Sequence, residues 1–79
     1  MQGKRLSDGE QLPSAIQPGD YWKHAQGWYG VTPNGELGNF RNHEVTEHED
    51  GTITVSPSIL VTGGNTWHGY LEKGVWRSC

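Results

Sequence analysis

The chain has 79 residues, of which 32% are hydrophobic and 19% charged, and its net charge is −3. This length predicts one domain near the lower size limit for independent folding. The acidic balance argues against binding to nucleic-acid phosphates, and no apolar run reaches the ~18 residues that span a membrane. Because Met1 to Asp20 lacks the apolar stretch of a signal peptide, we expect a soluble, cytoplasmic protein.

Large rings compensate for the sparse aliphatic content. The chain has four Trp, three Tyr and one Phe, and each such ring can bury roughly 150–250 Å². The core is therefore expected to be aromatic rather than aliphatic. The single cysteine, Cys79, excludes a disulfide within the chain, which is the usual staple of a small secreted domain.

Residues 1–17 are polar and are predicted to form a flexible or weakly ordered N-terminal arm, with a weak hairpin around Ser7-Asp8-Gly9 as the alternative. Residues 18–79 are predicted to form a single β domain. The turn at Pro18-Gly19-Asp20 begins its first strand, Tyr21 to His24.

Five short polar turns place a glycine third. A three-residue hairpin loop needs a positive φ at that position, which glycine adopts without a Cβ clash. The recurring turn therefore predicts an antiparallel meander of short strands. The five turns are Ser7-Asp8-Gly9, Ala25-Gln26-Gly27, Pro33-Asn34-Gly35, Glu49-Asp50-Gly51 and Glu72-Lys73-Gly74.

Three-residue loops also set which residues oppose each other, and a slip of one residue inverts both faces of a strand. The predicted pairs in the later hairpins are Val31 with Leu37, Val45 with Val55, Leu71 with Val75 and Tyr70 with Trp76. In the first hairpin they are Lys23 with Tyr29 and Trp22 with Gly30.

Thr52 to Val61 is the longest predicted strand, and Pro57 predicts a bulge or an edge position within it because proline donates no ladder hydrogen bond. Several short strands with one apolar face each do not stay flat and open. The predicted fold is all-β, an antiparallel meander closed into a small barrel, because the connections are tight hairpins. A two-sheet β-sandwich is the alternative.

Adjacent aromatic residues predict an exposed aromatic surface. Successive strand residues face opposite ways, so one ring of each adjacent pair should point outward. Exposed Trp and Tyr are typical anchors of protein interfaces and also stack on sugars. The candidate binding surface combines these rings with an acidic hairpin: Tyr21, Trp22, Trp28, Tyr29, Tyr70, His48, Glu49 and Asp50.

No motif for catalysis or cofactor binding is present. His43, His48 and His68 are weak metal-ligand candidates, since the first two are five residues apart and face opposite sides of one strand. The short thiolate spacing of structural zinc sites is absent. Strained nucleophile elbows and paired catalytic carboxylates are also absent. We expect no enzymatic activity and no cofactor.

Four segments resemble a family of small uncharacterised proteins of actinobacteriophages and actinobacteria. They are Pro18 to Trp22, Trp28 to Gly35, His48 to Val61 and Trp67 to Trp76. The most specific parts are Ser-Pro-Ser-Ile at 56–59 and Trp-His-Gly-Tyr-Leu at 67–71. The resemblance implies a phage origin and a site of action inside the host bacterium.

The residues predict a non-enzymatic protein-binding module, and the resemblance implies a phage accessory protein that acts on a host protein. A carbohydrate-binding module that uses exposed Trp and Tyr is one alternative. A structural virion component is another.

Overall fold

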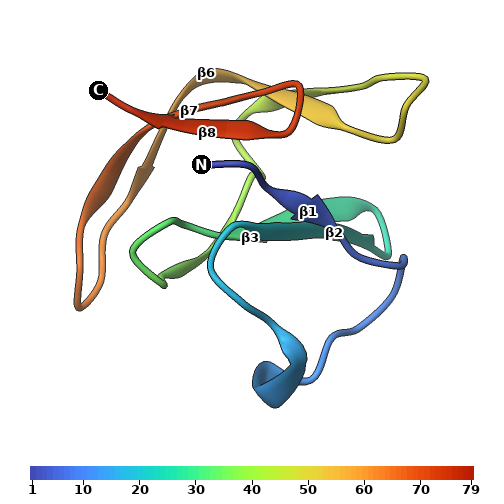
Figure 1. The fold of residues 1–79 in the computed structure, drawn as a ribbon, viewed down its shortest axis with the longest axis horizontal. Helices are drawn as coiled ribbons and strands as arrows, with labels where there is room; N and C mark the ends of the chain where they lie inside the picture. Colours follow the sequence, from blue (N-terminus) through green and yellow to red (C-terminus); the bar gives the residue numbers. More distant parts are fainter.

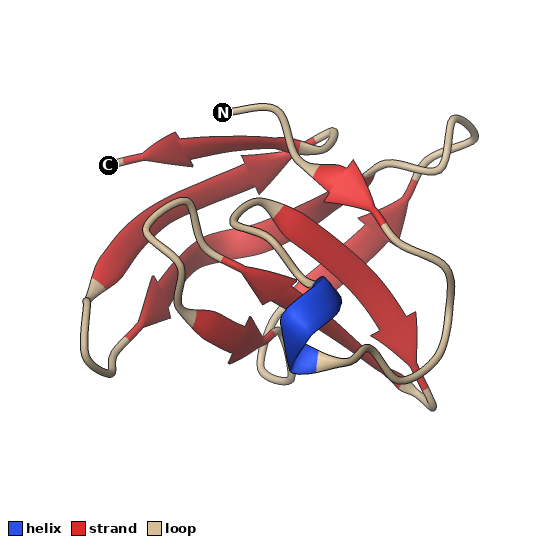
Figure 2. Cartoon of the chain, turned by 60° about the horizontal axis from the view of Figure 1, so that its bottom comes forward, coloured by secondary structure: helices blue, strands red, loops and turns tan.

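Eight strands form two four-stranded sheets in the computed structural model, which describes residues 1–79 (Figure 1). The first sheet has the order β1 (Lys4–Arg5), β2 (Asp20–His24), β3 (Gly27–Val31) and β4 (Leu37–Asn39). The second has the order β5 (Glu44–Glu47), β6 (Ile53–Val61), β7 (Trp67–Glu72) and β8 (Val75–Ser78). A short 3-10 helix, η1 (Pro13–Ala15), lies between β1 and β2 in the chain (Figure 2). No helix is long and apolar enough to cross a membrane.

The predicted closed barrel is wrong, and the sandwich alternative fits the two separate sheets. The barrel argument assumed a tight hairpin at every connection. Between β4 and β5, however, the chain makes a turn in which the His43 amide donates to the Phe40 carbonyl, and the two strands do not pair. The Phe40 side chain is buried in the core, so the chain leaves the first sheet here and enters the second.

The core lies between the two sheets and is half aromatic and half aliphatic, so the expected aromatic core is correct for only half of it. The buried cluster contains Tyr21, Phe40, Ile53, Val55, Ile59, Trp67, Leu71 and Trp76. The indole nitrogen of Trp76 donates to the Gly19 carbonyl at 2.9 Å. This bond satisfies the buried polar atom of the ring.

The N-terminal segment, for which a flexible or weakly ordered arm is predicted, forms hydrogen bonds with both sheets. Strand β1 pairs with β2 in parallel. The Gly3 amide donates to the Gly74 carbonyl at 2.7 Å, and the Trp76 amide donates to the Met1 carbonyl at 2.8 Å. A Cβ at Gly3 would lie 2.8 Å from the Gly19 carbonyl oxygen, so only glycine fits where this segment crosses between the sheets.

The three-residue loop is confirmed at two hairpins. Val31 pairs with Leu37 and Val45 with Val55, as the turns at Pro33-Asn34-Gly35 and Glu49-Asp50-Gly51 predict. The bulge predicted at Pro57 is also confirmed, because the β6–β7 register shifts between Val55 and Ile59.

The register is wrong by one residue at the other two hairpins, whose loops have two residues. Ala25 and Lys73 adopt positive φ angles of 54° and 47°, which the sequence rule assigned to glycine alone. Burial favours the observed register, because it places two buried residues, Leu71 and Trp76, opposite each other on the core face. The observed pairs are Tyr21 with Gly30, Trp22 with Tyr29, Lys23 with Trp28, Leu71 with Trp76 and Tyr70 with Arg77.

Candidate functional site

Tyr21 and Trp22 are both buried, so neither forms part of an exposed aromatic surface. Their side chains are 1% and 5% exposed, although they face opposite sides of β2. Tyr21 belongs to the core between the sheets, where burial raises the pKa of its hydroxyl. Trp22 faces away from the second sheet and stacks on Tyr29, with ring centroids 6.0 Å apart. The connection with η1 lies on this face (Figure 2), so the prediction that one ring must be exposed is wrong here.

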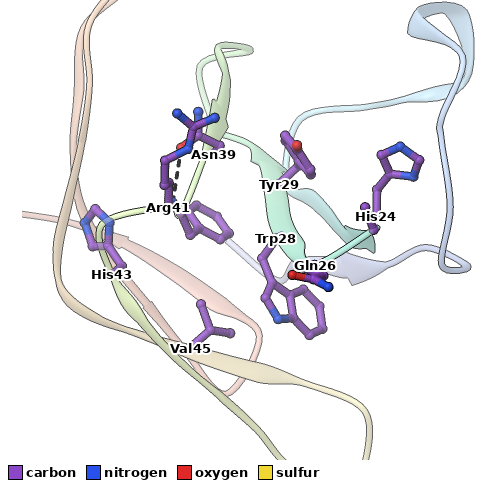
Figure 3. A pocket seen from close by; sticks show the side chains of 11 residues that line it. His24, Gln26, Trp28, Tyr29, Asn39, Arg41, His43 and Val45 are labelled. Atoms are coloured by element: carbon purple, nitrogen blue, oxygen red, sulfur yellow. Dashed lines mark hydrogen bonds between the residues drawn. The ribbon is translucent and has the colours of Figure 1, made fainter.

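The other predicted pair, Trp28 and Tyr29, lines a hollow in the surface of the molecule. We call it the Trp28–Tyr29 groove, and its volume is about 460 Å³. It lies where the tip of the β2–β3 hairpin approaches the connection from β4 to β5 (Figure 3). Its lining residues are His24, Ala25, Gln26, Gly27, Trp28, Tyr29, Asn39, Phe40, Arg41, His43 and Val45.

The side chains that line the groove include a cation but no carboxylate. The lining contains one arginine and two histidines but neither aspartate nor glutamate. The Asn39 side-chain oxygen accepts from the Arg41 amide at 3.1 Å, which directs its NH₂ group elsewhere. Arg41 is exposed and forms no ion pair. In this region the molecule therefore offers positive charge despite its acidic composition.

His43 forms part of the groove wall and is held by the second sheet. Its Nε2 lies 3.0 Å from the Ser58 carbonyl oxygen, so this nitrogen carries a proton and donates. The Nδ1 atom is then an acceptor, and it is buried without a partner. Its ring packs edge-on against Phe40, with centroids 6.5 Å apart. These contacts fix the position of one wall of the groove.

Two cations lie over the Trp28 ring. The Arg5 guanidinium is 5.0 Å from the ring centroid and the Lys23 ammonium is 5.9 Å from it. Arg5 also donates to the Glu47 carboxylate, to the Gly51 carbonyl at 3.0 Å and to Asp8 at 3.3 Å. The bond with Glu47 is the main cause that raises the pKa of Arg5. These contacts hold Trp28 in place and cover part of its ring, which remains half-buried.

The predicted acidic hairpin lies outside the groove and its polar groups stabilise their own turn. Asp50 accepts from the Thr52 amide at 3.0 Å and from the Thr52 hydroxyl at 2.6 Å, and these bonds lower the pKa of Asp50. His48 Nε2 lies 2.7 Å from the Thr54 hydroxyl. Neither these residues nor Glu49 line the groove.

Tyr70 is exposed, as expected, but it belongs to a different surface. It lies on β7, pairs with Arg77 of β8 and is 45% exposed. A hydrogen bond with Cys79 is the main cause that raises the pKa of Tyr70. Because the side chains of the core alternate with Tyr70 along β7, its ring faces away from the first sheet. The predicted binding surface is thus divided among separate regions.

The three histidines named as weak metal candidates each contact a separate polar atom of the protein, although His43 and His68 both reach Ser58. His43 contacts the Ser58 carbonyl, His48 contacts Thr54 and His68 contacts the Ser58 hydroxyl at 3.1 Å. No group of three or more His, Cys, Asp or Glu residues is arranged to hold a metal ion. The structure therefore does not bring the proposed ligands together.

Sequence reasoning missed most of the groove. His24, Gln26, Asn39, Arg41 and Val45 come from one hairpin tip and from the chain on either side of the β4–β5 connection. Only the crossing from one sheet to the other brings these segments together, and no local motif marks it. Comparison with known proteins adds no further assignment, because no family model, curated protein or solved structure matches the chain.

Proposed function

We propose that this chain is a non-enzymatic protein-binding module and that the Trp28–Tyr29 groove is its contact site. The observation that carries this proposal is the composition of the groove, where half-buried Trp28 and Tyr29 adjoin exposed polar side chains. Aromatic residues and arginine are enriched at the centres of protein interfaces, where an apolar surface is surrounded by polar groups.

The resemblance to actinobacteriophage proteins supports an extension of this proposal. The partner is a protein of the bacterial host, and the chain acts on it as a phage accessory factor. This origin and this partner depend on the resemblance alone.

The geometry of the rings counts against a carbohydrate-binding module. A sugar stacks on an open aromatic face. In this chain Arg5 and Lys23 lie over Trp28, and Trp22 stacks against Tyr29. A structural role in the virion would instead be indicated by finding the protein in purified phage particles.

Peptide binding followed by NMR tests the proposed function. The ¹⁵N-labelled chain is titrated with the best binders from a random peptide display library. We expect the indole signal of Trp28 and the amide signals of Gln26 and Arg41 to shift.

Two tyrosine variants provide a matched pair for this experiment. Tyr29→Ala should weaken peptide binding, whereas Tyr70→Ala on the other sheet should leave it unchanged. A library without any binder, or signal shifts confined to the Tyr70 surface, would reject the groove as a protein contact site.

A further inference from the structure

We infer that the Trp28–Tyr29 groove selects an extended peptide segment that carries a carboxylate close to a large apolar side chain. This inference rests on the proposed function and adds the chemistry of the ligand. It follows from three features of the groove: its uneven charge, the unpaired arginine and the separation of that arginine from Trp28 and Val45.

The charge of the groove opposes the charge of the chain. The protein has nine acidic residues and six basic ones, but no acidic residue lines the groove. A ligand carboxylate therefore meets no like charge in the lining, whereas a ligand cation finds no partner there. Complementary charge of this kind gives specificity and faster association.

Arg41 is the group that would bind the carboxylate. Arg5, which lies over the Trp28 ring, already binds Glu47 and Asp8. Arg41 has no acidic partner, and its guanidinium presents several N–H donors in a planar fork that matches a carboxylate. A carboxylate at Arg41 would therefore form an ion pair without breaking an existing one.

Arg41 lies apart from two apolar side chains of the groove. Arg41 and Asn39 lie together at one end, whereas Trp28 and Val45, with Gln26 beside Trp28, lie at the other (Figure 3). In an extended peptide, residues two positions apart point to the same side. A segment with an acidic residue two positions from a leucine-sized residue would therefore place one side chain at each end.

A peptide array tests this selectivity directly. Each peptide has a fixed leucine, followed two positions later by glutamate, glutamine or lysine. We expect the glutamate peptides to bind roughly tenfold more tightly than the glutamine peptides, as for one charge-assisted hydrogen-bonded pair. The lysine peptides should bind weakest.

Two exposed arginines provide a matched pair of variants. Arg41→Ala should abolish the preference for glutamate over glutamine, whereas Arg77→Ala on β8 should keep it. Arg41→Glu should reverse the preference in favour of lysine. The thermal unfolding midpoint of each variant confirms that the fold is intact.

The possible failures are distinguishable. Glutamate and glutamine peptides that bind the groove equally would overturn the inference and leave the proposed function standing. An Arg77→Ala variant that loses the preference would overturn it as well. If no peptide binds, both proposals fail. Binding of oligogalacturonate in that case would indicate that the chain recognises acidic sugars instead of peptides.

Discussion

The two arginines Arg5 and Arg41 occupy opposite situations. Arg5 stacks over the ring and contacts Glu47, Asp8 and the Gly51 carbonyl, so that it joins β1 to the β5–β6 hairpin of the other sheet. Arg41 lies on the other side of the Trp28–Tyr29 groove and has no ion-pair partner. Arg5 therefore belongs to a region that stabilises the fold, whereas Arg41 belongs to a region that is available to a ligand.

The largest loss of stability is expected when a side chain is added at Gly3, two residues before Arg5. A Cβ there would lie 2.8 Å from the Gly19 oxygen and 2.9 Å from the Gly74 oxygen, and backbone atoms cannot move aside cheaply. Gly3→Ala should therefore lower the free energy of unfolding by about 2–3 kcal/mol, the usual cost of overpacking. Urea denaturation measures this loss.

A glycine of the groove serves as the control for Gly3. A Cβ at Gly27 would meet its nearest atom, on Tyr29, at 3.8 Å, which is an ordinary contact. Gly27→Ala should change the stability by no more than about 0.5 kcal/mol. Equal effects at both positions would mean that the N-terminal segment does not cross between the sheets as described.

The second largest loss of stability is expected at Arg5, and Arg41 serves as the comparison. Arg5→Ala removes the contact with Trp28 and the hydrogen bonds to Glu47 and Gly51. It should lower the free energy of unfolding by about 1–2 kcal/mol, allowing for the partial exposure of these groups. Arg41→Ala should leave stability unchanged. Thermal unfolding of the two variants decides the matter, and an equal loss in both would remove the distinction between the two regions.

Local turn chemistry explains which parts of the fold were predictable. Pro33-Asn34-Gly35 and Glu49-Asp50-Gly51 form the predicted loops because their residues prefer the required φ angles. Ala25 and Lys73 adopt positive φ against their own preference. The pairing of buried side chains across the strands outweighs that preference, and a turn motif does not encode such pairing.

The sequence predicted only those residues of the candidate site that are neighbours in the chain. Trp28 and Tyr29 were found because pleating places them on opposite faces of β3. Arg41 and Asn39 were missed, since their approach to the hairpin tip depends on where the chain leaves the first sheet. Trp22 was wrongly predicted to be exposed. The connection with η1 lies on the outer face of the first sheet (Figure 2), and the sequence does not show where this connection packs.

The third loss of stability is expected in the turn at Gly51, whose carbonyl accepts a hydrogen bond from Arg5. Gly51 has a φ of +88°, and the nearest atom to a Cβ there is the Arg5 guanidinium nitrogen at 4.0 Å. Gly51→Val should therefore cost about 1–2 kcal/mol through backbone strain rather than through a clash. Gly51→Asn should cost less, because asparagine tolerates positive φ. Chemical denaturation would contradict this explanation if the valine and asparagine variants were equally stable.

The smallest expected effect is a loss of folding stability at low pH, which arises from Asp50 in the same turn. Hydrogen bonds from Thr52 lower the pKa of Asp50 below its ordinary value of 3.8. A carboxyl whose pKa is lower in the folded state adds stability above its unfolded pKa and loses it as the pH falls through the folded pKa. In wild type this contribution is complete at neutral pH and is lost progressively below about pH 4.

Asp50→Asn isolates this contribution, since the amide oxygen can still accept from Thr52 but the side chain does not titrate in this range. The variant should lose less stability than wild type between pH 5 and pH 2, as measured by urea midpoints at each pH. Salt concentration is held constant, so that the ion pairs of Arg5 with Asp8 and Glu47 are screened equally in both proteins. Parallel curves for variant and wild type would show that the bonds from Thr52 do not favour the ionised carboxyl.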